Sequence, residues 1–250
     1  MSTVYIGNAV GDEHGNANGG EPGDQTGKEL RIQPWYQNKK GWRVFRPKSP
    51  EVAAMLVYDM TVACESPFIG YDQKQRNTLY HAAKSVGFDC AKVTAYCECD
   101  CSSLVRVCLA YAGIKTDNFN TASEPNVLLK TGESEELTDK KYTDGSAYLM
   151  KGDVLCTKVK GHTAIVLNDG DKANEPEPVK DKMIKVKGSV RVREGNGKKF
   201  DPIPPTPSNC LLPYRGQAKE DPYWYETVWQ GQYGFISSNP KYTEIVEAEI

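Results

Sequence analysis

The uneven distribution of helical patterns along the 250-residue chain restricts its fold more than any other feature. Apolar residues recur at helical spacing only before about residue 130, whereas beyond about residue 185 only short strand-like pieces remain. A charged segment with two prolines, DGDKANEPEPVKDK, separates these parts and has no apolar period. We therefore expect an α+β domain over residues 1–178 and a small all-β domain over residues 179–250.

Within the first domain, the pattern predicts four helices and several strands. Ser49 is a good helix cap, Pro50 suits the first helical position, and Glu51 suits the positive end of the helix dipole. The segments LRIQPWY and GWRVFR are expected as short strands that pair with each other. The predicted helices cover residues 49–65, 72–86, 101–112 and 123–130, and two further strands cover 151–168.

Glycine, asparagine and aspartate dominate the N-terminal region, residues 1–48, which contains GNAVGDEHGNANGGEPGDQTGKE. This composition predicts turns and a long loop rather than a packed element. Two interpretations stay open: the loop forms one wall of a binding cleft, or it is a flexible arm.

Charge and hydropathy exclude several classes of partner. The 31 basic and 33 acidic residues leave a net charge of -2, so bulk attraction to nucleic acid is not expected. No apolar run approaches the roughly 20 residues of a membrane helix, so membrane insertion is not expected either. The first residues lack the basic and apolar regions of a signal peptide, which predicts a cytoplasmic protein.

Eight cysteines and only three histidines make candidate sites easy to enumerate. A disulfide framework is not expected in a reducing compartment. Cys101 stands where an extended stretch turns into a predicted helix. The helix dipole and free backbone N–H groups there favour a thiolate, with a pKa lowered from about 8.5 towards 3.5–7.5, and can hold an oxyanion. The alternative is a buried cysteine that only packs.

His162 begins a predicted strand directly after Gly161, where its side chain can reach a neighbouring helix terminus. The alternative is a surface histidine in a hairpin. Asn174 lies twelve residues further along and can orient the imidazole if the chain returns beside the histidine strand. Asp169 competes for the same role, and both are also normal turn residues.

These segments resemble the NlpC-type cell-wall cysteine peptidases of the NlpC and p-sixty superfamily, which have a circularly related papain-like fold. The first motif of that family stands here as DCSSLV at residues 100–105, ahead of a helix. The second stands as GDVL at 152–155 followed by GHTAIV at 161–166. The resemblance covers roughly residues 70–175.

The resemblance implies that Cys101 is the nucleophile and His162 the general base and acid, with Asn174 or Asp169 as the orienting residue. It implies cleavage of an amide bond in the peptide stems of peptidoglycan, with no metal and no cofactor. The substrate-binding residues that it implies are Asp100, Ser102 and Tyr96.

The segment after residue 185 resembles a bacterial SH3-like domain, through GSVRVREGNGKKFDPI, LPYRGQA and YGFISSNPKYTEIV. This resemblance implies a small barrel that binds the cell wall. Its dense aromatic set suits sugar or peptide binding, although a barrel of about 65 residues also needs some of these rings as its core. The set comprises Tyr223, Trp224, Tyr225, Trp229 and Tyr233.

Two other classes of function compete with a thiol hydrolase. Cys97, Cys99 and Cys101 form C-x-C-x-C and, with His162, provide a conceivable zinc site, although no second cysteine pair follows. A catalytically inactive wall-binding protein is the second alternative. The combined expectation is a phage or prophage lysin that stays in the cytoplasm until it is released to the peptidoglycan, its partner.

Overall fold

The computed structural model describes residues 3–174 and 180–249. The chain separates into two compact units, Met1–Glu175 and Pro176–Ile250. The predicted boundary between residues 178 and 179 lies outside the described residues. Among the described residues, no helix is both long enough and apolar enough to cross a membrane.

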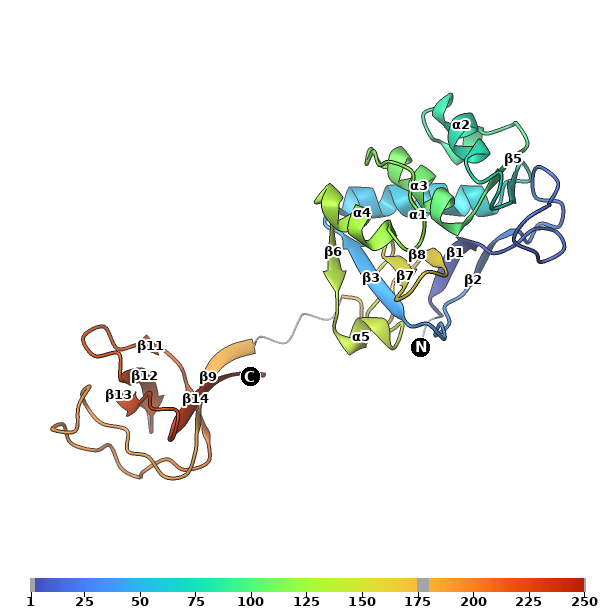
Figure 1. The fold of residues 1–250 in the computed structure, drawn as a ribbon. Helices are drawn as coiled ribbons and strands as arrows, with labels where there is room; N and C mark the ends of the chain where they lie inside the picture. Colours follow the sequence, from blue (N-terminus) through green and yellow to red (C-terminus); the bar gives the residue numbers. More distant parts are fainter. Residues whose placement is uncertain (1–2, 175–179, 250) are drawn as a thin grey trace. The chain divides into compact units, whose positions relative to one another are not determined.

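A six-stranded sheet forms the centre of the first unit, with strand order β2-β1-β8-β7-β3-β6 (Figure 1). Every neighbouring pair in this sheet is antiparallel. The strands are β1 (Tyr5–Ala9), β2 (Leu30–Pro34), β3 (Trp42–Pro47), β6 (Ser134–Leu137), β7 (Val154–Thr157) and β8 (Thr163–Val166).

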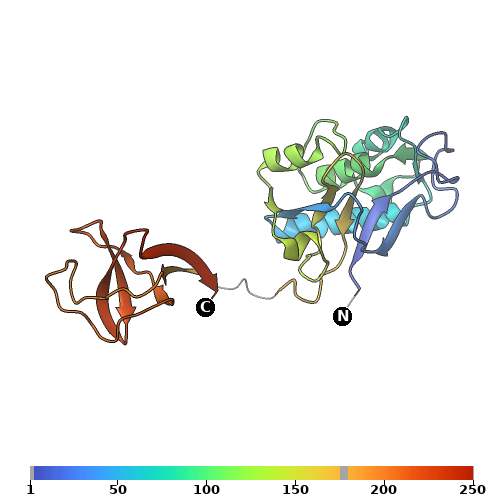
Figure 2. The same ribbon diagram turned by 60° about the horizontal axis from the view of Figure 1, so that its bottom comes forward.

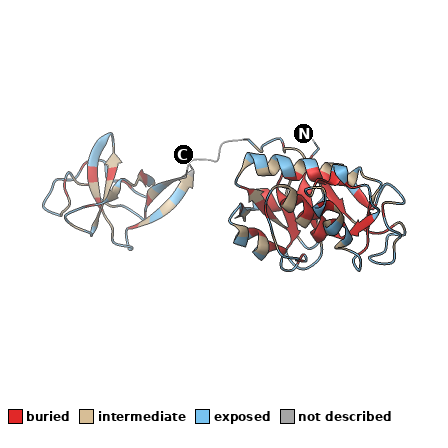
Figure 3. Ribbon diagram, turned by 90° about the horizontal axis from the view of Figure 1, so that it is seen from above, coloured by how far each residue is buried: buried red, intermediate tan, exposed pale blue. Residues whose placement is uncertain are grey.

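Helices α1 (Pro50–Cys64) and α3 (Cys101–Tyr111) cover one face of this sheet, and α1 runs across β1, β2, β3 and β8 (Figure 2). The main core lies between these two helices and the sheet, and a smaller core around Trp42 lies against the opposite face of the sheet (Figure 3). The unit is thus mixed α/β. Its other elements are β4 (Ile69–Tyr71), α2 (Thr78–Lys84), a 3₁₀ turn (Cys90–Lys92), β5 (Cys97–Cys99), α4 (Glu124–Thr131) and α5 (Lys140–Thr143).

The predicted helix starts are confirmed where a side chain caps the backbone. The Ser49 hydroxyl accepts the N–H groups of Glu51 and Val52, both at 3.2 Å, and α1 begins at Pro50. The predicted helix over 72–86 is too long, because α2 begins only at Thr78. Asp72 closes a turn by accepting the N–H of Lys74 at 2.6 Å, so the backbone there bonds locally and not along a helix.

The N-terminal region is more ordered than its composition predicts. Strand β1 is buried between β2 and β8, and Gly7 lets α1 approach it, since a Cβ there would lie 2.4 Å from Met60 Cγ. The predicted pairing of LRIQPWY with GWRVFR is wrong. Both form strands, but β2 pairs with β1, and β3 lies between β7 and β6.

Residues 10–29 form a loop that buried carboxylates fasten to the rest of the unit. Glu98 accepts the N–H of Gly23 at 3.0 Å, and Glu29 accepts the N–H of Tyr71 at 2.9 Å. These bonds tie the loop to β4 and β5, a parallel pair. They favour a fixed loop over a flexible arm.

The described part of the second unit contains strands and turns. Two antiparallel sheets form it, one with order β10-β9-β14 and one with order β11-β12-β13. Strand pairing within residues 180–249 does not close a barrel, so the predicted barrel is not formed. The strands are β9 (Lys180–Val186), β10 (Leu211–Pro213), β11 (Gly216–Gln217), β12 (Trp224–Trp229), β13 (Gln232–Ser237) and β14 (Thr243–Glu249).

Candidate active site

Cys101 is the first residue of α3, as the sequence predicts, and a reciprocal cap holds this turn. The Asp100 carboxylate accepts the N–H of Ser103 at 2.7 Å, while the Ser103 hydroxyl accepts the N–H of Asp100 at 2.8 Å. The first N–H groups of a helix have no partner within the helix, so the cap leaves donors available beside the cysteine.

Arg76 ties together the two residues predicted to line the substrate cleft. Its Nε lies 2.6 Å from Asp100 Oδ2, and its Nη2 donates to Ser102 Oγ at 2.8 Å. Both partners are buried, with exposed fractions of 8% for Asp100 and 1% for Ser102. These bonds hold the turn that presents Cys101, so the two side chains are already engaged within the protein.

His162 immediately precedes β8, at the end of the predicted β7–β8 hairpin. The backbone N–H of His162 donates to Thr157 Oγ1 at 2.9 Å, and the backbone carbonyl of His162 accepts the N–H of Thr157 at 3.0 Å. The N–H of the preceding Gly161 donates to Thr121 Oγ1 at 3.1 Å. The backbone around the histidine is therefore anchored on both sides.

A hollow of about 250 Å³ joins the helix start to this hairpin. Cys101, Thr121 and Gly161 line it. The N–H of Thr163, directly after His162, also points to the Cys101 sulfur. The structure thus brings together the two segments that the sequence singles out, 100–105 and 161–166.

Asn8, on β1, makes the side-chain hydrogen bond to the imidazole, with its Oδ1 at 2.8 Å from His162 Nε2. The Asn8 amide nitrogen donates to the carbonyl of Arg31 at 3.1 Å, which identifies Oδ1 as the acceptor. His162 Nε2 therefore carries the proton, and Nδ1 is left with the free electron pair. The Trp42 ring also lies near the imidazole, with the two ring centroids 6.4 Å apart.

Neither Asn174 nor Asp169 is hydrogen-bonded to His162 among the described residues. His162 lies at one end of β8, and the chain leaves from the opposite end, roughly 13 Å away for four residues. There Gly170 donates to the carbonyl of Leu149 at 2.9 Å, and Asp169 accepts the N–H of Lys151 at 2.8 Å. Sequence reasoning missed Asn8, because nothing in a glycine-rich stretch marks it as a partner of the distant histidine.

Burial sets the charge state of the resting site. It raises the pKa of the Cys101 thiol to about 12, with the negative charges of Asp100 and Glu124 adding to the rise. Burial also lowers the pKa of His162 to about 4. The predicted lowering of the thiol pKa by the helix terminus is therefore wrong, since desolvation outweighs it. At neutral pH both side chains are uncharged.

Two tyrosines that the sequence did not single out lie near the thiol. Burial raises the pKa of Tyr36 above its usual value and that of Tyr71 to about 12, and the charge of a Cys101 thiolate adds to both shifts. Tyr96, the predicted substrate contact, stands before β5, is 66% exposed and packs on Phe68 with ring centroids 5.3 Å apart. It does not line the hollow at Cys101.

The C-x-C-x-C segment runs from β5 into the start of α3, and the thiols of Cys97 and Cys99 have separate backbone partners. Cys97 Sγ lies 3.6 Å from the Phe68 carbonyl, and Cys99 Sγ lies 3.5 Å from the Gly70 carbonyl. Across residues 3–174 and 180–249, no group of three or more His, Cys, Asp or Glu side chains is arranged to hold a metal ion. The zinc alternative therefore finds no ligand set there.

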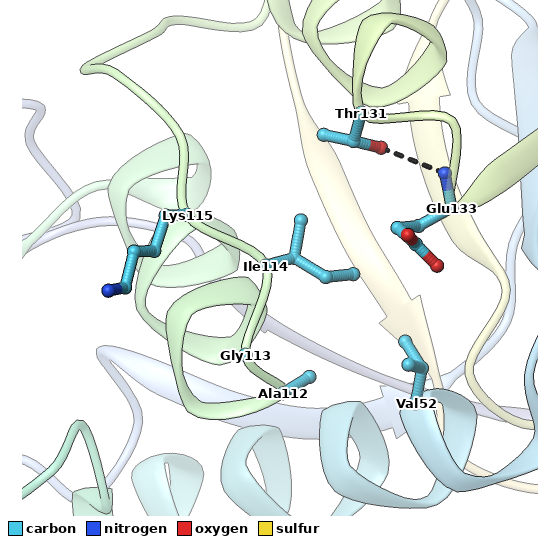
Figure 4. Close-up of a pocket in the computed structure, with 7 residues that line it drawn as sticks. All are labelled: Val52, Ala112, Gly113, Ile114, Lys115, Thr131 and Glu133. Atoms are coloured by element: carbon cyan, nitrogen blue, oxygen red, sulfur yellow. Dashed lines mark hydrogen bonds between the residues drawn. The ribbon is translucent and has the colours of Figure 1, made fainter.

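A second hollow, of about 400 Å³, opens at the other end of α3 (Figure 4). Ala112 and Ile114 line it together with Val52 of α1 and Glu133 after α4. An eleven-residue helix, roughly 16 Å long, separates it from Cys101. It contains no cysteine or histidine, so we assign the candidate site to the first hollow.

Fold and site together define a mixed α/β protein in which a cysteine at a helix start and the turn before a histidine-led strand line one hollow. A family model described as the endolysin-like domain matches residues 6–173. The chain therefore belongs to the endolysin-like domain family, which supports a phage-lysin type of cell-wall hydrolase. No curated protein and no solved structure matches the chain.

Proposed function

We propose that the first unit is a peptidoglycan hydrolase of the papain-like, NlpC type that cuts an amide bond in the peptide stem. Cys101 is the nucleophile, His162 the base and acid, and Asn8 takes the orienting role expected of Asn174. One observation carries the proposal: the 2.8 Å contact between His162 Nε2 and Asn8 Oδ1. It leaves Nδ1 unprotonated, as a general base requires.

The uncharged resting pair implies that proton transfer accompanies attack. His162 Nδ1 takes the thiol proton as the Cys101 sulfur bonds to the amide carbonyl carbon. Backbone N–H groups at the start of α3 stabilise the oxyanion, and the hydroxyl of Tyr36, whose pKa burial and a Cys101 thiolate raise, is the further donor that we propose. His162 then gives its proton to the departing amine. Water, deprotonated by the same imidazole, hydrolyses the thioester and restores the thiol.

We propose further that residues 179–250 form an SH3-like module that binds the wall. The aromatic residues there divide between the two expected roles. Tyr225 and Trp229 pack against the small core, whereas Tyr223 and Tyr233 are 76% and 54% exposed. Exposed rings can stack on sugars or peptides. A lysin with this organisation acts on the wall after release.

Lysis of purified walls by Cys101→Ala tests the catalytic proposal. We expect a loss of activity of about 10³-fold or more, because the covalent route disappears. Cys97→Ala, a matched change of a buried cysteine on β5, is expected to keep much of the activity. Undiminished lysis by folded Cys101→Ala would refute the assignment. Loss of lysis with both variants would point instead to a shared structural role.

Removal of the second unit tests the binding proposal. A chain ending near Glu177 is expected to cleave soluble stem-peptide fragments at the full-length rate and to lose pelleting with intact walls, because tethering raises the effective substrate concentration. Pelleting equal to that of the full chain would refute the binding role.

A further inference from the structure

The second unit contains a hollow of about 360 Å³ that combines three cations with two aromatic rings. Arg191, Arg193 and Lys198 line it, together with Trp224 and Tyr242. Backbone hydrogen bonds fix one wall of the hollow. The Arg193 N–H donates to the Phe235 carbonyl at 2.9 Å, and the Phe235 N–H donates to the Arg193 carbonyl at 2.8 Å, so Arg193 pairs with β13.

The cations of this hollow lack negative partners. Among the described residues, no ion pair or side-chain hydrogen bond involves Arg191 or Lys198, and Arg193 Nη1 donates only to the Phe200 carbonyl, at 2.6 Å. No carboxylate lines the hollow. Three positive groups gathered without a counter-charge repel one another, so an anion bound there relieves this repulsion.

Another hollow of the same unit provides the contrast. It is lined by Lys185 and Lys187, but both are paired with Glu244, at 3.2 Å and 2.6 Å. Its cations therefore already share a carboxylate partner within the protein. Arg191 and Lys198, beside the rings, have no such partner among the described residues.

The rings supply a surface for an uncharged part of the same ligand. Trp224 begins β12 opposite Ser237 of β13, is half-buried, and its indole N–H donates to no other described residue. Tyr242 is 39% exposed. An indole face with a free N–H beside a phenol suits a sugar ring, which offers C–H groups to the face and oxygen acceptors to the N–H.

We propose that this hollow binds an anionic glycan, with a sugar ring on Trp224 and its anionic group on Arg191 and Lys198. The inference rests on the proposed wall binding and names the site and the chemistry that perform it. The anionic group is a phosphate or a carboxylate, since arginine and lysine bind both.

The test measures pelleting of full-length protein with purified walls, in a Cys101→Ala background so that no wall is consumed. We expect Arg191→Glu and Lys198→Glu each to weaken binding about tenfold or more, and added salt to weaken the parent protein more than either variant. Arg215→Glu is the matched control, because Arg215 is also exposed but lies outside the hollow. Equal binding by all three variants would overturn the proposal.

Two kinds of wall distinguish the sources of the anion. Hydrofluoric acid removes polymers linked by phosphodiesters and leaves peptidoglycan, whose stems carry carboxylates. Loss of the Arg191-dependent binding on treated walls identifies a phosphate polymer, and its persistence identifies the peptidoglycan carboxylates. A negative result at this site would leave the catalytic proposal unchanged, because that proposal is tested separately, by cleavage of soluble stem fragments and by Cys101→Ala.

Discussion

The two units differ most in what they bury. Around Cys101 the first unit encloses polar side chains, whereas the only buried polar residues in the described part of the second unit are Thr227 and Thr243. Buried polar groups are costly unless each finds a partner, so those around Cys101 indicate a site that needs fixed geometry. The buried set around Cys101 includes Asn8, Asp100, Ser102, Ser103, Glu124 and Thr163.

The second unit places its charge on the surface instead. Its small core is aliphatic, and Arg191, Lys198 and Tyr242 stand exposed beside a half-buried Trp224. Binding tolerates such adaptable, hydrated contacts, whereas bond cleavage needs side chains held to fractions of an ångström. The contrast therefore predicts that chemistry belongs to the first unit and adhesion to the second.

His162→Ala is the substitution expected to distinguish the functions of the two units most strongly. Loss of the base should lower kcat for soluble stem fragments about 10³-fold. Pelleting with walls should not change. His81→Ala is the control, because His81 is exposed on α2. A fall in wall binding equal to the fall in kcat would break the proposed division of labour.

Asn8→Ala is expected to lower kcat about 10²-fold, because the imidazole loses the acceptor that selects its tautomer. Asn174→Ala is expected to change it little. Asn8→Asp should retain part of the activity and, by adding a negative charge, raise the pKa of His162. The acid limb of the pH–rate profile should then move to higher pH. An unchanged profile with Asn8→Asp would indicate that Asn8 has only a structural role.

The half-buried, neutral His162 makes stability depend on pH. The side chain titrates near 6.5 when unfolded and at about 4 when folded, so between these values only the unfolded chain takes up the proton. The free energy of unfolding should therefore fall by roughly 3 kcal/mol as pH drops from 6.5 to 4. Denaturant titration should show this loss reduced in His162→Gln, which keeps a donor for Asn8. The same pH dependence in both proteins would contradict a neutral, half-buried imidazole.

Tyr36→Phe is expected to have the smallest effect on catalysis, about tenfold in kcat with little change in KM, because only a hydrogen bond to the oxyanion is lost. Tyr96→Phe is the matched change of a tyrosine that is 66% exposed and packs on Phe68, and it should leave kcat within about twofold of the parent. Equal effects of the two substitutions would remove Tyr36 from the proposed oxyanion site.

Much of the first unit could be predicted because local signals determine it. The cap at Ser49, the cap at Asp100 and the hairpin after Gly152 each depend on neighbouring residues, and the corresponding elements form where expected. These elements carry the cysteine and the histidine, and the two segments that the sequence singles out meet at one hollow.

The remaining part of the site depends on pairing between distant segments. Asn8 reaches His162 because β1 lies antiparallel to β8, with Gly7 opposite Ile165, and no local pattern encodes this register. Burial, a property of the whole fold, likewise reversed the predicted shift in the Cys101 pKa. In the second unit, strand and turn signals predict the elements, but the closing of a barrel depends on pairings that short strands leave undetermined.

Mass spectrometry of the intact protein, quenched with acid during turnover of a soluble stem fragment, tests the central claim most directly. The account predicts a covalent acyl adduct that peptide mapping places on Cys101. It predicts that the adduct is absent from Cys101→Ala and that it forms far more slowly in His162→Ala. An adduct on another residue, or undiminished cleavage by Cys101→Ala, would contradict the account.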